Sequence, residues 1–341
     1  MSDGEKEKNT VRSRKFFEAA VLILLVLFPL GSGYLFSDFY VALVLRILIF
    51  GILILGFDLL AGYCGLTSFG HAMFFGTGAY VAALVWKYVS ASVWLGIFAG
   101  LGLNAIIGYI LAILCVRTRT IYFVFLTFAF SQFFYVAADS WRRVGGTDGI
   151  SGIPIPTLIP GIALEHRNAI YYFVLAVLLL AYWVARRIVN SHFGRVLVGV
   201  HQNEERVKFL GYNPSVLIRR VFLISALFGS VSGTLMVCFQ PFVSPTYYHW
   251  GMSGSFMIMA LLGGMGTLVG PLLGTAIVIV LGDVLSTWFK DAWMLCLGIL
   301  YILCVLYSPG GVAQIVRNPW VASVTTRFLG RPAKGPGHGE S

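Results

Sequence analysis

Repeated apolar runs of about twenty residues constrain this chain more than any other feature. A helix needs about 20 mainly apolar residues to cross a hydrocarbon core of about 30 Å, and such runs recur along the whole sequence. Hydrophobic residues make up 58% of the chain and charged residues only 11%, against roughly 25% charged in an average soluble domain. The short alternating segments of a membrane β-barrel are missing. The pattern predicts an all-α polytopic membrane protein.

We expect about ten transmembrane helices. The third and eighth segments are short and glycine-rich, so either could be a full span or a re-entrant or broken helix whose backbone is buried in protein. The ten segments are 16–35, 39–60, 69–85, 93–115, 121–138, 169–189, 216–240, 251–266, 268–288 and 292–307.

Basic residues predict the orientation. With a cytoplasmic N-terminus and ten crossings, most of the 24 lysines and arginines fall inside, as the positive-inside rule requires. If only one of the two doubtful segments failed to cross, every later loop would change sides and the asymmetry of basic residues would be lost. Both segments therefore cross, or neither does. Both termini are then cytoplasmic. The net charge of +10 reflects topology and suits anionic lipid, so it indicates no nucleic-acid partner.

One membrane domain, at 16–308, is expected between cytoplasmic tails at 1–15 and 309–341. The loop at about 139–168 contains RRVGGTDGISGIPIPTLIPG and lies outside in this topology. Its glycines and prolines are typical of turns, so we expect an ordered external loop without regular elements.

A short charged helix at about 203–211 interrupts the apolar runs on the inner side. Asn203 is a good N-cap, Glu204 lies in the first turn, and Lys208 lies in the last. Gly211 is a typical helix stop, and Pro214 prevents continuation. The pattern predicts about two turns of helix.

The faces of this helix differ in character. We expect its apolar residues, Val207, Phe209 and Leu210, to rest on neighbouring protein. The charged residues, Glu204, Glu205, Arg206 and Lys208, then reach outward. This reading leaves open an ordered connector with no partner.

Enzyme and metal motifs are missing from the sequence. It has no H-E-x-x-H, no G-x-S-x-G and no Walker A motif, and its six histidines and five cysteines do not form metal-ligand patterns. We therefore expect no metal and no catalytic residues. Ion-driven transport needs charge deep in the membrane, but Arg46, Asp58 and Asp283 lie near span ends, where we expect them to reach interfacial water by snorkelling.

Glycine organises the spans. Pairs at GxxxG spacing, at 96 and 100, 229 and 233, and 270 and 274, let helix backbones approach closely. Two denser segments, 62–80 and 261–275, either pack tightly or line a path with polar contacts. His71, at the start of the third segment, is expected to cap or bond locally rather than relay protons. Candidate path residues are Thr67, Ser68, His71, Gly76, Gly78, Gly263, Gly264 and Gly266.

Several ordered motifs carry a family resemblance from about 47 to 311. They are GFDLLAGYCGLTSFGHAMFFGTGAYVAAL, TIYFVFLTFAFSQ followed by GGTDGISGIP, VGVHQNEERVKFLGYN, and LLGGMGTLVGPLLGT. With these motifs the chain resembles the LivM-type permease subunits of bacterial ABC importers for branched-chain amino acids.

The resemblance implies a helical plan similar to the vitamin B12 importer class of permeases, in the bacterial inner membrane. The implied partners are a LivH-like second permease, two ABC ATPase subunits (LivG/LivF-like) and a periplasmic substrate-binding protein. ATP and Mg would be used by the ATPase subunits, with no cofactor on this chain. The implied ATPase-coupling residues are Asn203, Glu204, Glu205, Arg206, Lys208 and Gly211, and the implied binding-protein docking residues are Arg142, Arg143 and Asp148.

Two departures concern substrate and coupling. His201 stands where relatives commonly have arginine, and GLTSFGH stands where they often have GQLSLGH. The substrate therefore stays open among leucine, isoleucine and valine and the urea, amides and aromatic acids that relatives carry. A stand-alone secondary transporter or channel is the main competing hypothesis, and a membrane enzyme or scaffold is disfavoured for want of a convergent catalytic set.

Overall fold

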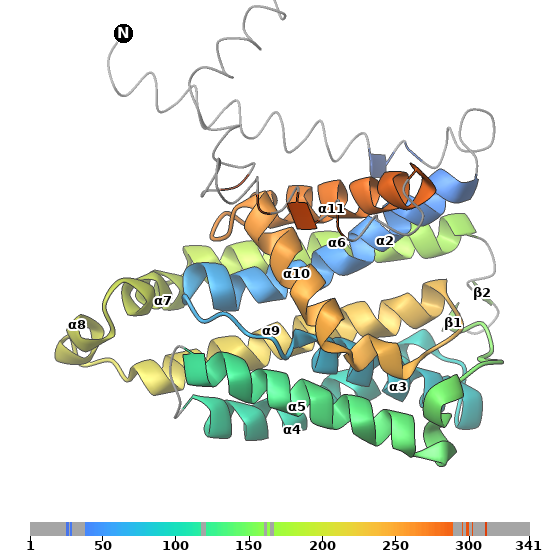
Figure 1. Cartoon of the computed structure of the whole chain (residues 1–341), viewed down its shortest axis with the longest axis horizontal. Helices are drawn as coiled ribbons and strands as arrows, with labels where there is room; N and C mark the ends of the chain where they lie inside the picture. The colour runs from blue at the N-terminus through green and yellow to red at the C-terminus, as the bar shows by residue number, and fades with distance from the viewer. Residues whose placement is uncertain are drawn as a thin grey trace, which may run out of the picture.

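The computed structural model describes residues 38–116, 121–159, 162–163 and 167–288, together with isolated positions at 25, 26, 28, 295, 298, 299, 302 and 311. The predicted segments at 16–35 and 292–307 lie almost wholly outside the described residues, as do both predicted tails. Apolar helices dominate the described part (Figure 1). They are α2 (Asp38–Asp58), α3 (His71–Tyr88), α4 (Val93–Cys115), α5 (Ile121–Ser140), α6 (Arg167–Asn190), α9 (Pro214–Phe239), α10 (Trp250–Gly263) and α11 (Val269–Trp288).

Shorter elements connect these helices. A π-helical turn extends α2, two short helices join α6 to α9, 3₁₀ turns precede the ribbon and α10, and two strands form an antiparallel ribbon. Their bounds are η1 (Leu59–Tyr63), η2 (Arg142–Val144), η3 (Gly146–Asp148), β1 (Thr157–Ile159), β2 (Ile162–Ala163), α7 (His192–Gln202), α8 (Glu204–Phe209) and η4 (Pro245–Tyr248).

The predicted helical class is confirmed, and within the described ranges eight of the ten predicted segments are helices. Six candidate spans are long and apolar enough to cross a membrane, and α3 and α10, the two doubtful segments, are not among them. The six are Phe39–Tyr63, Val93–Cys115, Ile121–Ser140, Asn168–Asn190, Pro214–Phe239 and Val269–Trp288.

Helix α10 is shorter than predicted. It has 14 residues, which gives a length of about 21 Å against a hydrocarbon core of about 30 Å. It ends at Gly263 because Gly264 and Gly266 adopt φ of +98° and +78°, so the prediction of helix to 266 was wrong. The chain before α10 is non-helical at 240–244, and Ser131 Oγ of α5 donates to the Tyr248 carbonyl at 2.9 Å. Contacts of this kind satisfy backbone that a helix would otherwise satisfy.

Helix α9 lies at the centre of the bundle and packs against α2, α3 and α4. Small residues allow the close approach: a Cβ at Gly233 would overlap the Phe75 carbonyl of α3, and a Cβ at Gly78 would overlap the Ser230 backbone. Hydroxyls then bridge the helices, since Ser232 Oγ donates to the Ile49 carbonyl at 2.7 Å. The glycine pairs thus serve helix packing within this chain.

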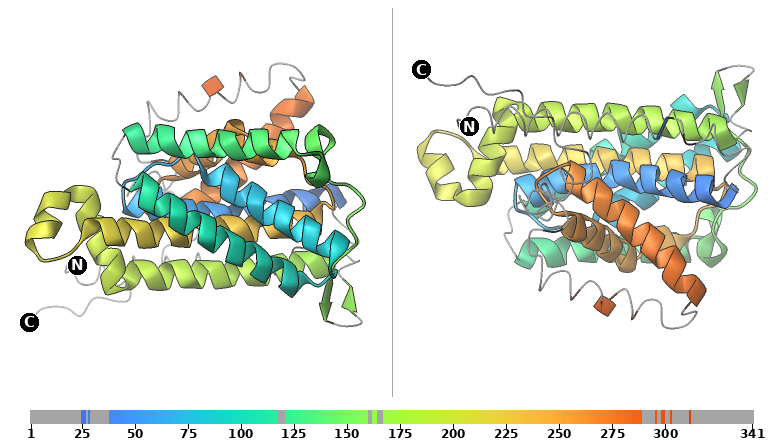
Figure 2. Two further views of the ribbon diagram at one scale, coloured as in Figure 1. Left: turned by 90° about the horizontal axis from the view of Figure 1, so that it is seen from below. Right: turned by 90° about the horizontal axis from the view of Figure 1, so that it is seen from above.

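The two ends of the bundle carry different structures. Helices α7 and α8 project from one end, and the β1–β2 ribbon lies at the opposite end (Figures 1 and 2). The predicted topology puts 139–168 and 203–211 on opposite sides of the membrane; the two segments lie at opposite ends of the bundle, and the side of the membrane that each end faces stays a prediction. The expectation of no regular elements at 139–168 was wrong, because β1 pairs with β2 there and Ile150 pairs with Val243.

Candidate functional site

Helix α8 begins and ends as the sequence predicts. The Asn203 side chain accepts from the Arg206 backbone N–H at 2.9 Å, and Gly211 adopts φ of +85° just beyond the helix. The Asn203 backbone N–H also donates to the Gly199 carbonyl of α7 at 2.9 Å. One residue therefore closes α7 and caps α8, which fixes the two helices to each other.

The apolar face of α8 is arranged differently from the prediction. Val207 is buried, but Phe209 is 89% exposed and Leu210 is 70% exposed. The expectation that all three rest on neighbouring protein is therefore wrong for Phe209 and Leu210. Val207 faces α7, where a Cβ built on Gly199 would lie 3.2 Å from Val207 Cγ2, whereas Phe209 and Leu210 turn outward. Two adjacent large apolar side chains are thus exposed at the end of the described bundle.

The charged residues of α8 interact with one another as well as facing outward. Lys208 Nζ lies 2.6 Å from Glu205 Oε1 and 3.9 Å from Glu204 Oε1. Glu205, Arg206 and Lys208 are exposed, and Glu204 is half-buried. The apolar pair is therefore bordered by a surface of mixed charge.

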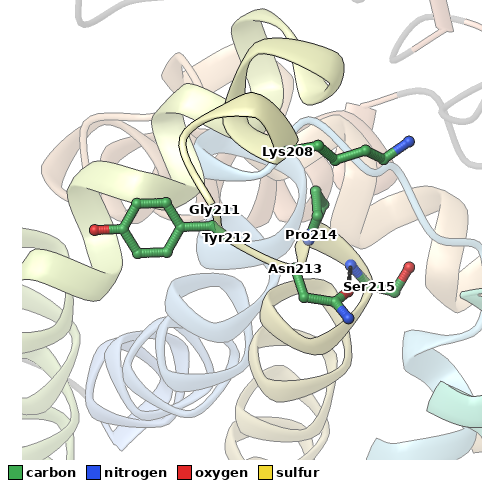
Figure 3. A pocket seen from close by; sticks show the side chains of 6 residues that line it. All are labelled: Lys208, Gly211, Tyr212, Asn213, Pro214 and Ser215. Atoms are coloured by element: carbon green, nitrogen blue, oxygen red, sulfur yellow. Dashed lines mark hydrogen bonds between the residues drawn. The ribbon is translucent and has the colours of Figure 1, made fainter.

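A shallow hollow of about 360 Å³ lies between α8 and the start of α9 (Figure 3). Asn213 caps α9 by accepting from the Ser215 N–H at 3.1 Å. The Tyr212 ring points away from Lys208 (Figure 3), and its hydroxyl lies 2.6 Å from His192 Nε2 of α7. The hollow is lined by Lys208, Gly211, Tyr212, Asn213, Pro214 and Ser215.

The candidate path residues fall into two groups that approach each other near the α8 end. The first group lies in the α2–α3 loop (64–70) and in α3. The second lies at the end of α10 and in the α10–α11 turn (264–268). A Cβ at Gly62 would overlap the Gly266 nitrogen, so the stretch leading into the first group directly touches the second.

Within the first group, Ser68 bonds locally, whereas the hydrogen bond of His71 goes to a different helix. Ser68 Oγ accepts from the Gly70 N–H at 3.1 Å. His71 is buried, with Nε2 at 2.6 Å from Ser225 Oγ of α9. Thr67 is half-buried in the loop.

The glycines of both groups lie at close helix contacts. Gly76 packs against the Tyr248 ring, and Gly78 packs against Ser230. A Cβ at Gly263 would overlap the Gly270 carbonyl of α11, and the left-handed Gly264 and Gly266 form the turn itself. Glycine is therefore required at these positions because a side chain would clash with a neighbouring helix or because the backbone has a positive φ.

Asp58 is a functional candidate whose environment differs from the prediction. Its side chain is fully buried, with Oδ1 accepting from the Gly266 N–H at 2.6 Å and Oδ2 accepting from the Leu268 N–H at 3.1 Å. The expectation that it reaches interfacial water is wrong, because the α10–α11 turn covers it. A carboxylate at the end of an apolar span, followed by a glycine-rich stretch, is the signal that could have indicated such a backbone contact.

Arg46 and Asp283 interact across α2 and α11. Arg46 Nη1 lies 3.6 Å from Asp283 Oδ2, with side chains 38% and 23% exposed. The two opposite charges therefore offset each other between the two helices. Among the described residues, no group of three or more His, Cys, Asp or Glu side chains is placed to hold a metal ion.

The external candidates lie near the ribbon end of the bundle. Arg142 and Arg143 form η2, Asp148 ends η3, and all three are exposed. Lys87 Nζ donates to the Ser151 carbonyl at 2.8 Å, which ties the end of α3 to this loop. The three charges thus lie on an ordered surface opposite α8.

Comparisons with known proteins agree on one family. The family model described as "Branched-chain amino acid transport system / permease component" matches residues 39–306. The LivM permease protein of the high-affinity branched-chain amino acid transport system is 29% identical in Escherichia coli K12 and 27% identical in Salmonella typhimurium, in each case over 89% of this chain and 76% of the relative. LivH of Escherichia coli K12 is 24% identical over 77% of this chain and 90% of the relative. No solved structure matches the chain.

Proposed function

Because this chain belongs to the branched-chain amino acid transport permease family, we propose that its α7–α8 segment is the point at which partner ATPases drive it. The chain is a multi-pass membrane protein and a permease subunit of an ABC importer. It is not itself an enzyme in this assignment, and ATP hydrolysis with Mg belongs to the partner chains. The inner membrane of a bacterium is the proposed location.

The observation that carries the coupling proposal is the exposed apolar pair on α8. Phe209 ends α8 and Leu210 follows it directly, and the two side chains are 89% and 70% exposed. The helix itself is capped at both ends and fixed to α7. Exposed aromatic and aliphatic side chains at the centre of a charged rim are typical of protein interfaces. A groove on an ATPase subunit would bury this pair, and Asn203, Glu204, Glu205, Arg206, Lys208 and Gly211 would form or shape the rim.

The remaining partners follow from the family. A LivH-like permease would form the second half of the translocation path, and two LivG/LivF-like ATPases would bind on the α8 side. A periplasmic binding protein would dock on the opposite side, where Arg142, Arg143 and Asp148 are exposed. Ten spans in the plan of the vitamin B12 importer class would complete the subunit.

The substrate proposed is a branched-chain amino acid, with small amides or acids as alternatives within the same proposal. The proposed path includes the two groups of residues that meet near the α8 end. Their members are Thr67, Ser68, His71, Gly76, Gly78, Gly263, Gly264 and Gly266.

Co-purification from native membranes in mild detergent tests this function. We expect two ATPase polypeptides and a second permease to accompany the chain, and we expect the assembly with its binding protein to import leucine, isoleucine or valine only with ATP. Urea and benzoate serve as competitor solutes that distinguish the substrate classes. Recovery of the chain alone, together with leucine uptake into liposomes without ATP, would refute the proposal and favour a stand-alone transporter.

A further inference from the structure

A continuous line of contacts links α8 to the turn that precedes α11. It passes from α7 to the α2–α3 loop, then to the end of α2, and finally to the α10–α11 turn (264–268). These elements are far apart in the sequence, at 192–209, 58–66 and 264–268. Each contact in the line is direct.

The first contact joins α7 to the α2–α3 loop. His201 lies in the last turn of α7, and a Cβ built on Gly65 would lie 2.5 Å from His201 Cδ2. Gly65 also has φ of +77°, a conformation that glycine adopts without the steric cost of a side chain. The imidazole therefore rests directly on the loop backbone, so that a displacement of α7 presses on the loop.

The second contact lies at the end of α2. The π-helical turn η1 (Leu59–Tyr63) extends α2 directly after Asp58 and leads into the α2–α3 loop. A Cβ at Gly62 would overlap both Asp58 Oδ1 and the Gly266 nitrogen. The absence of a side chain at Gly62 therefore lets η1, the Asp58 carboxylate and the α10–α11 turn lie in direct contact.

The third contact holds the α10–α11 turn. Asp58 accepts from the Gly266 N–H at 2.6 Å and from the Leu268 N–H at 3.1 Å. Leu268 adopts φ of +59° without being glycine, and such a residue persists only where its surroundings hold it. The two bonds to a buried carboxylate supply that restraint, so the shape of the turn depends on a residue in α2.

We propose that Asp58 is a positioning residue for transport, which transmits movement of the α7–α8 segment to the α10–α11 turn and thereby to α11. The inference rests on the proposed coupling role of α8. In this relay, meaning the line of contacts described above, His201 of α7 presses on the α2–α3 loop at Gly65. Gly62 allows close contact with the turn, and the carboxylate of Asp58 holds the turn. The opposing interpretation is that the same bonds only stabilise the bundle.

Asn104 provides a matched control. It is fully buried in α4 and donates through Nδ2 to Ser230 Oγ at 2.9 Å and to the Phe74 carbonyl at 3.3 Å. Like Asp58 it is buried and forms two hydrogen bonds to residues far away in the sequence, but its partners lie outside the line of contacts described above. Its replacement measures the cost of losing a buried polar bridge in general.

The first experiment compares Asp58→Asn and Asn104→Ala in the assembled transporter, reconstituted with its ATPases, second permease and binding protein. Asparagine keeps one acceptor oxygen but turns an N–H₂ group toward the other backbone donor, so we expect leucine uptake per ATP hydrolysed to fall roughly tenfold. We expect Asn104→Ala to lower yield while leaving this ratio unchanged. Equal ratios in Asp58→Asn and the wild type would overturn the proposal.

The second experiment needs no transported substrate. Met265 lies half-buried in the turn, so we would introduce Met265→Cys into a background whose five cysteines are replaced by serine. The rate of maleimide labelling is then measured with and without vanadate-trapped nucleotide. We expect trapping to change this rate several-fold, and we expect Asp58→Asn or His201→Ala to remove most of that change.

The outcomes separate this inference from the function on which it rests. The proposal is refuted if trapped nucleotide does not change the labelling rate at position 265. It is also refuted if nucleotide changes this rate equally in the wild type, Asp58→Asn and His201→Ala. Either result, obtained while the ATPases bind normally, would show that no movement passes through Asp58. Failure of the wild-type chain to bind ATPases would instead refute the proposed function. Retained nucleotide response in Asn104→Ala, with loss in Asp58→Asn, would support the relay.

Discussion

Replacing Phe209 by alanine tests the α8 interface quantitatively. The side chain is 89% exposed in the described chain, so its removal leaves the fold of the subunit nearly unchanged. Burying a phenylalanine completely contributes about 1.5–3 kcal/mol. If a partner groove buries this ring, we expect Phe209→Ala to weaken ATPase binding by about 2 kcal/mol, or about 30-fold in Kd.

Val198 offers the control for this measurement. It lies on α7 and is 37% exposed, so it belongs to the same segment but not to the apolar pair. We expect Val198→Ala to change Kd by about twofold or less, in keeping with surface substitutions in general.

The assay titrates purified ATPase subunits onto the permease pair in lipid nanodiscs and measures Kd by interferometry. Membrane yield and thermal stability of each variant show whether the subunit itself is intact. Equal Kd values for Phe209→Ala, Val198→Ala and the wild type would refute the assignment of the apolar pair to the interface. A parallel loss of yield in Phe209→Ala would refute the reasoning that the ring is free of its own chain.

Three further substitutions test other parts of the structure. Glu204→Lys with Glu205→Lys reverses charge on the rim and removes both partners of Lys208, so we expect normal insertion but roughly fivefold less ATPase in pull-downs. Gly233→Ala places a Cβ against the Phe75 carbonyl, and we expect a loss of about 1–3 kcal/mol, seen as lower thermal stability in detergent. Arg46→Met leaves Asp283 without Arg46, and we expect a loss of about 1 kcal/mol because the pair is partly exposed, which adding Asp283→Leu should largely restore.

Controls for these tests are available in the chain. Gly102 is exposed in α4, and a Cβ there meets nothing within 4 Å. We expect Gly102→Ala to keep or slightly raise stability, since alanine favours helix over glycine by about 1 kcal/mol. A similar loss in Gly102→Ala and Gly233→Ala would contradict the packing explanation. Unchanged stability in Arg46→Met would show that the ion pair contributes nothing.

Local signals accounted for much of the fold. The bounds of α4 match the predicted 93–115 segment, and the caps of α8 lie at Asn203 and near Gly211. Apolar run length, capping residues and glycine act over a few neighbouring residues, so sequence alone carries them. The same locality explains the misplaced end of α10, because the left-handed turn after Gly263 is held by Asp58, about two hundred positions earlier.

The candidate site was likewise predicted only in part from the sequence. The sequence located the short charged helix and the glycine-rich segments, but it assigned Phe209 and Leu210 to the wrong environment. Whether an apolar side chain on a six-residue helix is covered depends on the angle at which the neighbouring helix approaches. Asn203 joins α7 to α8 through its backbone and its side chain, and a periodic pattern of apolar residues does not encode how the two helices then lie relative to each other.

By itself the sequence determined that this protein is a helical membrane protein, because apolar runs of that length leave the backbone few other ways to satisfy its hydrogen bonds in lipid. It also determined the family, through ordered motifs along most of the chain. Only the tertiary structure decided which polar groups meet. Asp58 and the α10–α11 turn, or His201 and Gly65, are brought together by helix packing across the bundle, and such long-range contacts leave no periodic trace along the chain.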